Sequence, residues 1–185
     1  QAIIDRLAGC TVRGMTIAAP GFYGPQGRVV RQGLAMPDML KDIESFIQER
    51  PDSALSALKS IDRQSIVTHA QEAKYTLLYA IALDKNVIDT TDIGIIIPAV
   101  RYYSKHGSPN DKLRSLYYLG RIYQNAANFQ KDTIARKKAL VTFTKAESFV
   151  PKATDKKTAA LLHMAIATMY SQVYSTDKEM EYIER

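Results

Sequence analysis

Beyond residue 37, apolar side chains recur at the three- and four-residue spacing that places them on one face of an α-helix. The pattern is clearest in residues 111–151, where two sets are separated by a polar break. The first set holds positions i, i+3, i+4 and i+7: Leu116, Leu119, Gly120 and Tyr123. The second holds positions i, i+4, i+7 and i+12: Ala139, Phe143, Ala146 and Pro151. Small residues allow a neighbouring helix to come close and large ones fill gaps, so the pattern predicts two antiparallel helices packed on each other.

The same periodicity predicts three further helical pairs along the chain. Their ranges are 39–47 with 51–61, then 69–85 with 91–106, and, after Pro151, an initial helix followed by 177–185. The initial helix of the last pair repeats the spacing described above, with Ala167 in the place of Gly120. Pro98 falls inside the helix predicted at 91–106 and removes one backbone hydrogen bond, so we expect a kink there.

The order Leu, Leu-Gly, Tyr, then Ala, Phe, Ala, Pro resembles the tetratricopeptide repeat, a helix-turn-helix unit that stacks on copies of itself. The segments that begin at Glu49, Ala82, Tyr102 and Tyr117 look like tetratricopeptide-type proteins of Bacteroidetes. The resemblance covers about residues 38–185. It implies an all-α fold of antiparallel helix-turn-helix repeats, a right-handed α-solenoid with a concave binding surface.

One spacing departs from that family. The glycine and the first alanine of the second helix stand twelve residues apart in the repeat, whereas Gly120 and Ala139 stand nineteen apart. The seven extra residues lie around 132–138. Because seven residues make almost two helical turns, an elongated second helix would keep the same face inward. A longer, basic connecting loop is the alternative.

Residues 1–37 form a separate, loop-rich segment of about 40 residues, and 38–185 form the helical domain. Residues 14–31, continuing to 43–46, resemble a segment of bacterial uridine phosphorylases. That resemblance implies that Phe22 packs on a pyrimidine base while Gln26 and Arg28 hydrogen-bond its amide edge. The phosphate- and ribose-binding segments of that family have no counterpart in this chain. A nucleoside phosphorylase-related protein, or a remnant nucleoside-binding segment, is therefore the alternative function.

The net charge of +6 is concentrated in one segment, because residues 131–157 contain eight basic and three acidic side chains. This segment contains no glycine and matches none of the usual nucleic-acid motifs, so we do not expect a nucleic-acid partner. Lys131 to Lys157 could instead contact an anionic surface, such as an acidic protein or anionic lipid. The longest apolar run, residues 93–100, is too short to span a membrane as a helix.

The sequence predicts no metal site and no cofactor. Cys10 is the single cysteine, and the three histidines lie far apart. Residues 7–10 have the form of a lipoprotein cleavage box, but Asp5 and Arg6 occupy the position of the apolar segment that a signal peptide needs. We therefore interpret Cys10 as an unmodified thiol.

These observations favour a non-catalytic scaffold that binds a protein or peptide on its concave face. No catalytic residues are predicted. The binding residues expected on the first helices of the pairs are Lys74, Tyr75, Arg114, Tyr117, Tyr118 and Arg121. The family resemblance implies a sensor or adaptor part of a bacterial envelope protein, located in the cell envelope or periplasm, with a cytoplasmic location as the alternative.

Overall fold

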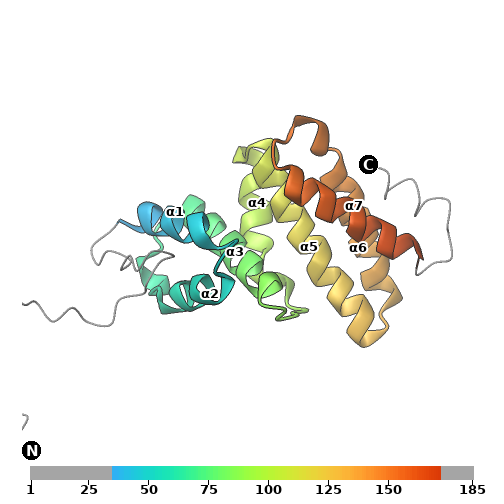
Figure 1. The fold of residues 1–185 in the computed structure, drawn as a ribbon, viewed down its shortest axis with the longest axis horizontal. Helices are drawn as coiled ribbons and strands as arrows, with labels where there is room; N and C mark the ends of the chain where they lie inside the picture. The colour runs from blue at the N-terminus through green and yellow to red at the C-terminus, as the bar shows by residue number, and fades with distance from the viewer. Residues whose placement is uncertain (1–34, 172–185) are drawn as a thin grey trace, which may run out of the picture.

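A computed structural model describes residues 35–171, and this part of the chain is entirely helical, without a strand. Seven α-helices follow one another (Figure 1): α1 (Met36–Phe46), α2 (Pro51–Ser60), α3 (His69–Lys85), α4 (Ile97–His106), α5 (Pro109–Gln130), α6 (Thr133–Glu147) and α7 (Lys156–Ser171). Three short 3-10 helices, Arg63–Ser65, Ile93–Ile95 and Val150–Lys152, lie in the connections. The predicted all-α class is thus confirmed for the described residues. The predicted helix at 177–185 lies outside them.

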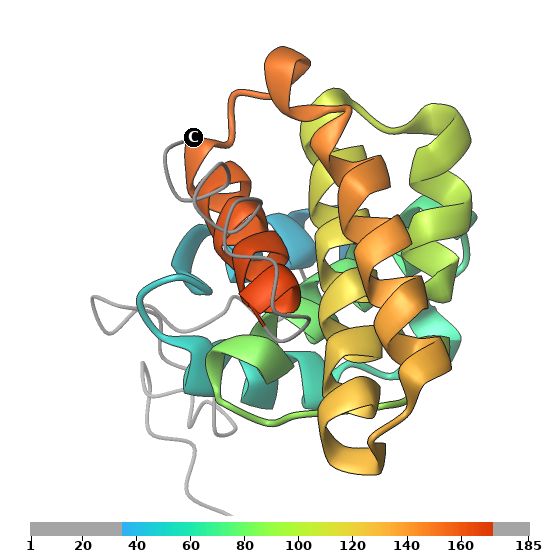
Figure 2. The same cartoon turned by 90° about the vertical axis from the view of Figure 1, so that its right-hand side faces the viewer.

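The helices pack in a regular order. Each helix contacts the next one along the chain, and α1 also contacts α3, α3 contacts α5, and α5 contacts α7. The odd-numbered helices therefore form a continuous series from one end of the molecule to the other. Figure 2 shows the longest helix, α5, side by side with α6.

Several helix starts are encoded by local polar residues. Thr68 and Ser108 form capping boxes at the starts of α3 and α5, with Gln71 and Asp111 as the reciprocal partners. The Asp132 side chain accepts hydrogen bonds from the first backbone amides of α6. These caps explain why the chain leaves one helix and enters the next within a few residues.

The core forms from the faces that the periodicity predicted. Gly120 is buried on α5, and Phe143 is buried on α6. A Cβ atom at Gly120 would overlap the Phe143 ring. Two ring atoms would lie closer to that Cβ than the ring Cζ does, and the Cζ itself would be only 2.9 Å from it. On α7, the predicted residues His163, Ile166 and Ala167 are also buried. The predicted inward faces of these three helices are confirmed, except that Pro151, which lies in the 3-10 helix after α6, is exposed.

The kink expected at Pro98 is wrong. A 3-10 helix at Ile93–Ile95 precedes α4, which begins at Ile97, so Pro98 lies in the first turn. Backbone amides in the first turn have no partner inside the helix, and proline is accommodated there without breaking a hydrogen bond.

The long basic loop considered between Gly120 and Ala139 is also wrong. Only Lys131 and Asp132 connect α5 to α6. Lys131 adopts a left-handed conformation with φ of 50°, which ends α5 sharply. The extra residues lengthen both helices, since α5 continues ten residues past Gly120 and α6 begins six residues before Ala139.

Candidate functional site

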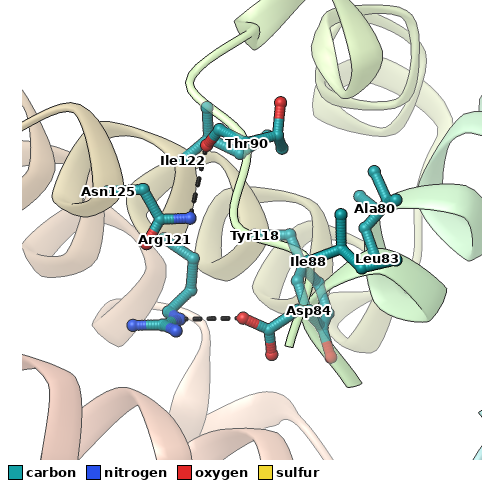
Figure 3. A pocket seen from close by; sticks show the side chains of 9 residues that line it. All are labelled: Ala80, Leu83, Asp84, Ile88, Thr90, Tyr118, Arg121, Ile122 and Asn125. Atoms are coloured by element: carbon teal, nitrogen blue, oxygen red, sulfur yellow. Dashed lines mark hydrogen bonds and ion pairs between the residues drawn. The ribbon is translucent and has the colours of Figure 1, made fainter. Parts of the chain in front are cut away.

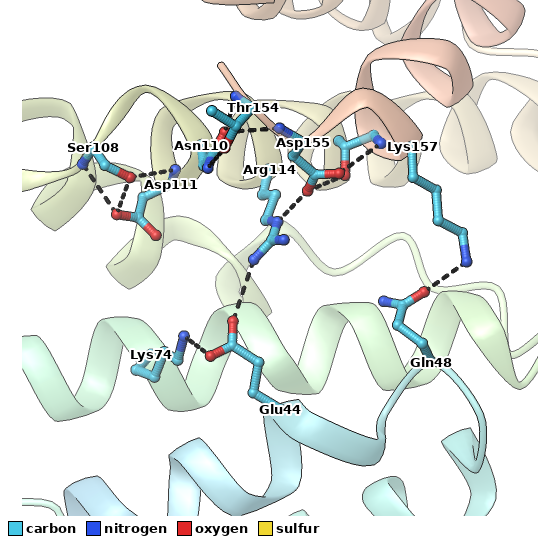
Figure 4. A network of polar contacts seen from close by, with 11 residues as sticks. Glu44, Gln48, Lys74, Ser108, Asn110, Asp111, Arg114, Thr154, Asp155 and Lys157 are labelled. Carbon is cyan, nitrogen blue, oxygen red and sulfur yellow. Dashed lines mark hydrogen bonds and ion pairs between the residues drawn. The ribbon is translucent and has the colours of Figure 1, made fainter. Parts of the chain in front are cut away.

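A chain of ion pairs connects the odd-numbered helices (Figure 4). Glu44 of α1 accepts a hydrogen bond from Lys74 of α3 at 2.5 Å and another from Arg114 of α5 at 3.2 Å. The Nε of Arg114 also donates to Asp155, which directly precedes α7. These side chains are half-buried, so the contacts both orient the helices and place charge on the surface that the helices share.

Asp155 is the most constrained member of this network. Its carboxylate accepts hydrogen bonds from the backbone N–H of Thr158 at 3.0 Å and from the Thr158 hydroxyl at 2.8 Å, which caps α7. Burial alone would raise the pKa of Asp155, but the Thr158 hydrogen bonds and the Arg114 guanidinium outweigh burial and lower this pKa. The pKa of Arg114 is raised in turn, although its own burial acts in the opposite direction.

Asn110 adds a second connection between α5 and the start of α7. Its side-chain oxygen accepts hydrogen bonds from the backbone amides of Thr154 at 2.8 Å and Asp155 at 3.1 Å. Its side-chain nitrogen donates to the Thr154 hydroxyl at 2.8 Å. The position of α7 relative to α5 is thus held by both charge and amide contacts.

A cavity of about 160 Å³ adjoins this network. Its apolar wall includes Ile47, Ile81 and Leu161, which come from or directly follow α1, α3 and α7. Two lysines, Lys85 and Lys157, also line it. The cavity therefore combines an apolar wall with positive charge, which suits a ligand with one apolar group and one anionic group.

Neither lysine forms an ion pair with a carboxylate in the part of the chain described, although the charge of Asp84 acts to raise the pKa of Lys85. Burial, and then the neighbouring charge of Lys157, lower the pKa of Lys85. Lys157 donates to the side-chain oxygen of Gln48 at 2.9 Å, which is a neutral partner. Asp84, the nearest acidic neighbour of Lys85 in sequence, forms an ion pair with Arg121. The lining thus has an excess of positive charge around Lys85 and Lys157.

Three residues expected to be exposed for peptide binding are buried, and that expectation is wrong. Tyr75, Tyr117 and Tyr118 are each 5% exposed or less. Tyr75 stacks on Tyr79 and donates to the backbone oxygen of Leu58. Burial raises the pKa of Tyr117 to about 12. The odd-numbered helices pack on each other as well as on the even-numbered ones, so these rings fill the core, although Tyr118 also borders the cavity.

The three charged residues expected at the binding surface are placed differently. Lys74 and Arg114 belong to the ion-pair network, and Arg114 lines the cavity. Arg121 lies at a second, much smaller pocket of about 10 Å³, where it binds Asp84 at 3.0 Å and Gln124 at 2.6 Å (Figure 3). Asn125 donates to the Thr90 backbone oxygen in the same pocket. This pocket has room for no more than about one water molecule, so its side chains tie α3 and its following loop to α5.

Sequence reasoning missed Lys85 and Lys157. Lys85 occupies the last position of α3, where a cation is common because it favours the helix dipole. Lys157 belongs to a basic segment and carries no distinguishing pattern. Only the packing of α7 on α5 and α6 brings Lys157 to the cavity that Lys85 of α3 also borders.

Phe22, Gln26 and Arg28, the residues implied in nucleoside binding, lie outside the described residues. Within residues 35–171, no cluster of histidine, cysteine and carboxylate side chains has the arrangement of a metal site. None of the described helices is both long and apolar enough to cross a membrane.

Comparison with known proteins adds no relative. No protein-family model, no curated protein and no solved structure matches the chain. The class that the described residues define is an all-helical protein with serially packed helices, and its function has to be argued from the cavity and the surface.

Proposed function

We propose that this protein is a non-catalytic helical-repeat scaffold of the tetratricopeptide type that binds an extended protein segment. The order of helix contacts supports this proposal, since each helix packs on the next and each odd-numbered helix packs on the next odd-numbered one. Stacked helical hairpins produce this order, and their first helices then share one extended surface. That surface carries the ion-pair network and the cavity.

The observation that carries the proposal is the pairing of Lys85 and Lys157 beside the apolar wall of the cavity. An acidic side chain of a bound segment would neutralise the two lysines, and an apolar side chain two residues away would bury surface against Ile81 and Leu161. Extended segments present alternate side chains to a groove, which fits a binding surface made of several helices. The proposed ligand is therefore a peptide with an acidic residue and an apolar residue two positions apart, whose side chains point to the same side.

A binding role also agrees with the state of the carboxylates that line the cavity. Asp155 caps a helix and pairs with Arg114, and Glu44 is shared by two cations. Both are committed to holding helices together. The lining of this cavity therefore offers charge recognition and apolar contact.

Selection of displayed random peptides of about 12 residues on the immobilised protein tests the proposal. We expect the enriched peptides to contain an acidic residue and an apolar residue two positions apart. Their affinity, measured by fluorescence anisotropy, should fall about tenfold or more in the Lys85→Ala/Lys157→Ala variant. A control variant, Lys41→Ala/Lys105→Ala, removes the same charge from exposed positions away from the cavity and should bind as the unmodified protein does. Selected peptides that bind both variants equally, or a selection without enrichment, would contradict the proposal.

A further inference from the structure

The outward face of α6 carries a stripe of apolar and basic residues. The stripe consists of Ile134, Lys137, Lys138, Val141, Lys145 and Ser148, and all six are exposed. They follow the spacing i, i+3, i+4, i+7, i+11 and i+14, so they share one side of the helix. We call this set the α6 stripe.

The opposite side of α6 packs the core. Ala135, Ala139, Phe143 and Ala146 are buried there, against α5. Among residues 35–171, no helix covers the α6 stripe, which extends about 20 Å at 1.5 Å per residue. Figure 2 shows α6 lying along the outside of α5.

The apolar side chains of the stripe are largely exposed to solvent. Ile134 is 64% exposed and Val141 is 69% exposed. At 100° per residue, these two side chains lie nearly on one line along the helix, with Lys137 on one side and Lys138 on the other. Phe129, 65% exposed at the end of α5, adds a third apolar side chain at the same end of the helical pair as Ile134.

The positive charge of the stripe has no opposing carboxylate within it. The two acidic residues nearest in sequence contact other groups. The Asp132 carboxylate caps α6, and the Glu147 carboxylate lies 3.8 Å from His163 of α7. Lys138 lies over the Tyr123 ring, with its Nζ 5.8 Å from the ring centre, yet remains exposed. The face therefore presents three lysines and an apolar line to solvent.

We infer that the α6 stripe docks on an anionic lipid surface, with the lysines at the lipid phosphates and Ile134 and Val141 entering the headgroup region. The flanking lysines have long apolar stems that let their charges reach the phosphates while the central side chains insert. A straight, convex helix face meets a planar surface along its whole length. Neither of the two cavities described above is lined by a residue of the stripe, so a ligand of the stripe is recognised on the outward helix face itself. This inference does not depend on peptide binding in the cavity.

Sedimentation with lipid vesicles tests the inference on the full chain. We expect the protein to bind vesicles of phosphatidylcholine with about 30% phosphatidylserine and to bind pure phosphatidylcholine vesicles much more weakly. Because each lysine near such a surface contributes roughly fivefold to affinity, the variant Lys137→Glu/Lys138→Glu/Lys145→Glu should lose more than about 100-fold. Raising the salt concentration should release the unmodified protein.

Two further variants separate the stripe from net charge and from the cavity. The variant Lys41→Glu/Lys59→Glu/Lys105→Glu makes the same charge change at exposed positions on other helices, and it should retain most of the binding. Ile134→Ser/Val141→Ser keeps the charge and should weaken binding several-fold, while Lys85→Ala/Lys157→Ala should leave it unchanged. Circular dichroism confirms that each variant is folded.

Three results would overturn the inference. The first is equal binding to anionic and neutral vesicles, and the second is an equal loss in both triple-glutamate variants. The third is binding of soluble poly-glutamate at the stripe without vesicle binding, which would assign the face to an acidic protein partner.

Discussion

The ring of Phe143 on α6 occupies the space where a side chain at Gly120 of α5 would begin. Phe143 is fully buried, and Gly120 lies near the middle of α5, the longest helix. A glycine in a helix interior normally costs about 1 kcal/mol relative to alanine. Here that cost is offset because the missing Cβ lets a large ring sit directly against the α5 backbone.

Gly120→Ala should therefore destabilise the protein by about 1–3 kcal/mol, despite the better helix propensity of alanine. Urea unfolding followed by circular dichroism measures this change. Phe143→Leu reduces the overlap, so the double variant should lose less than the sum of the two single variants. A Gly120→Ala variant as stable as the unmodified protein would show that α5 and α6 can separate at no cost.

The Gly120–Phe143 contact could be predicted from the sequence because both residues belong to helix faces whose spacing is local. The range 69–85 predicted from apolar periodicity is that of α3, and the structure adds the capping box of Thr68 and Gln71 at its start. Propensity and capping are properties of a short segment, and one sequence is enough to read them.

The failures involve contacts between distant segments. Tyr117 and Tyr118 lie on a helix that packs against other helices on more than one side. The apolar periodicity of a helix does not reveal how many helices pack around it. Glu44 and Arg114 form an ion pair across 70 residues, and the cavity near Lys85 depends on where α7 packs. Such positions are set by the stacking of the helices, which no single segment encodes.

Val87, directly after the C-cap residue of α3, adopts a left-handed conformation with φ of 56°. Its backbone N–H donates to the Asp84 oxygen and that of Ile88 donates to the Leu83 oxygen, the pair of bonds that usually accompanies a glycine at this position. Left-handed backbone strains a β-branched residue, and the Val87 side chain is 83% exposed, so it gains little from packing.

Val87→Gly should consequently raise the free energy of unfolding by about 1 kcal/mol. Thermal and urea unfolding measure the gain. Val67→Gly is the matched control, because Val67 is equally exposed, at 78%, but does not have a positive φ. The control should lower stability, since glycine then only adds freedom to the unfolded chain. A destabilised Val87→Gly variant would mean that the Val87 side chain makes a favourable contact.

Asp155 should make the stability of the protein depend on pH in the acid range. Its pKa in the folded protein is lower than the ordinary value of 3.8, so the folded state binds this proton less readily than the unfolded state does. The stabilisation is complete above the ordinary pKa and is lost as the pH falls through the lowered one. Asp155→Asn keeps an oxygen that can accept from Thr158 but removes the charge that pairs with Arg114.

Urea unfolding at pH 7 and at successively lower pH values down to about 2.5 measures this dependence. Asp155→Asn should be less stable than the unmodified protein at pH 7, and the two should converge at the lowest pH. Asp38→Asn, which alters an exposed carboxylate in the first turn of α1, serves as the control and should leave the difference between pH values nearly unchanged. A constant gap between the Asp155→Asn and unmodified proteins at every pH would contradict the charge-based explanation.

Lys85 should contribute to peptide binding at the expense of stability. Burial and the nearby charge of Lys157 lower its pKa, so the folded protein holds the Lys85 proton less tightly than the unfolded chain does. The unfavourable contribution is present at neutral pH, and it disappears as the pH rises through the lowered pKa towards the ordinary value of 10.5. Lys85→Gln removes the ammonium while preserving much of the side-chain length, and it should be more stable at pH 7 by a margin that shrinks in alkaline solution. Lys105→Gln, at an exposed position near the end of α4, should show neither effect.

The same Lys85→Gln variant should bind the selected acidic peptides more weakly, because the charge that destabilises the empty cavity is the one that an acidic ligand neutralises. Urea unfolding and anisotropy titration on one preparation measure both quantities, and a variant that is less stable at pH 7 but binds peptide normally would show that Lys85 acts in packing the helices.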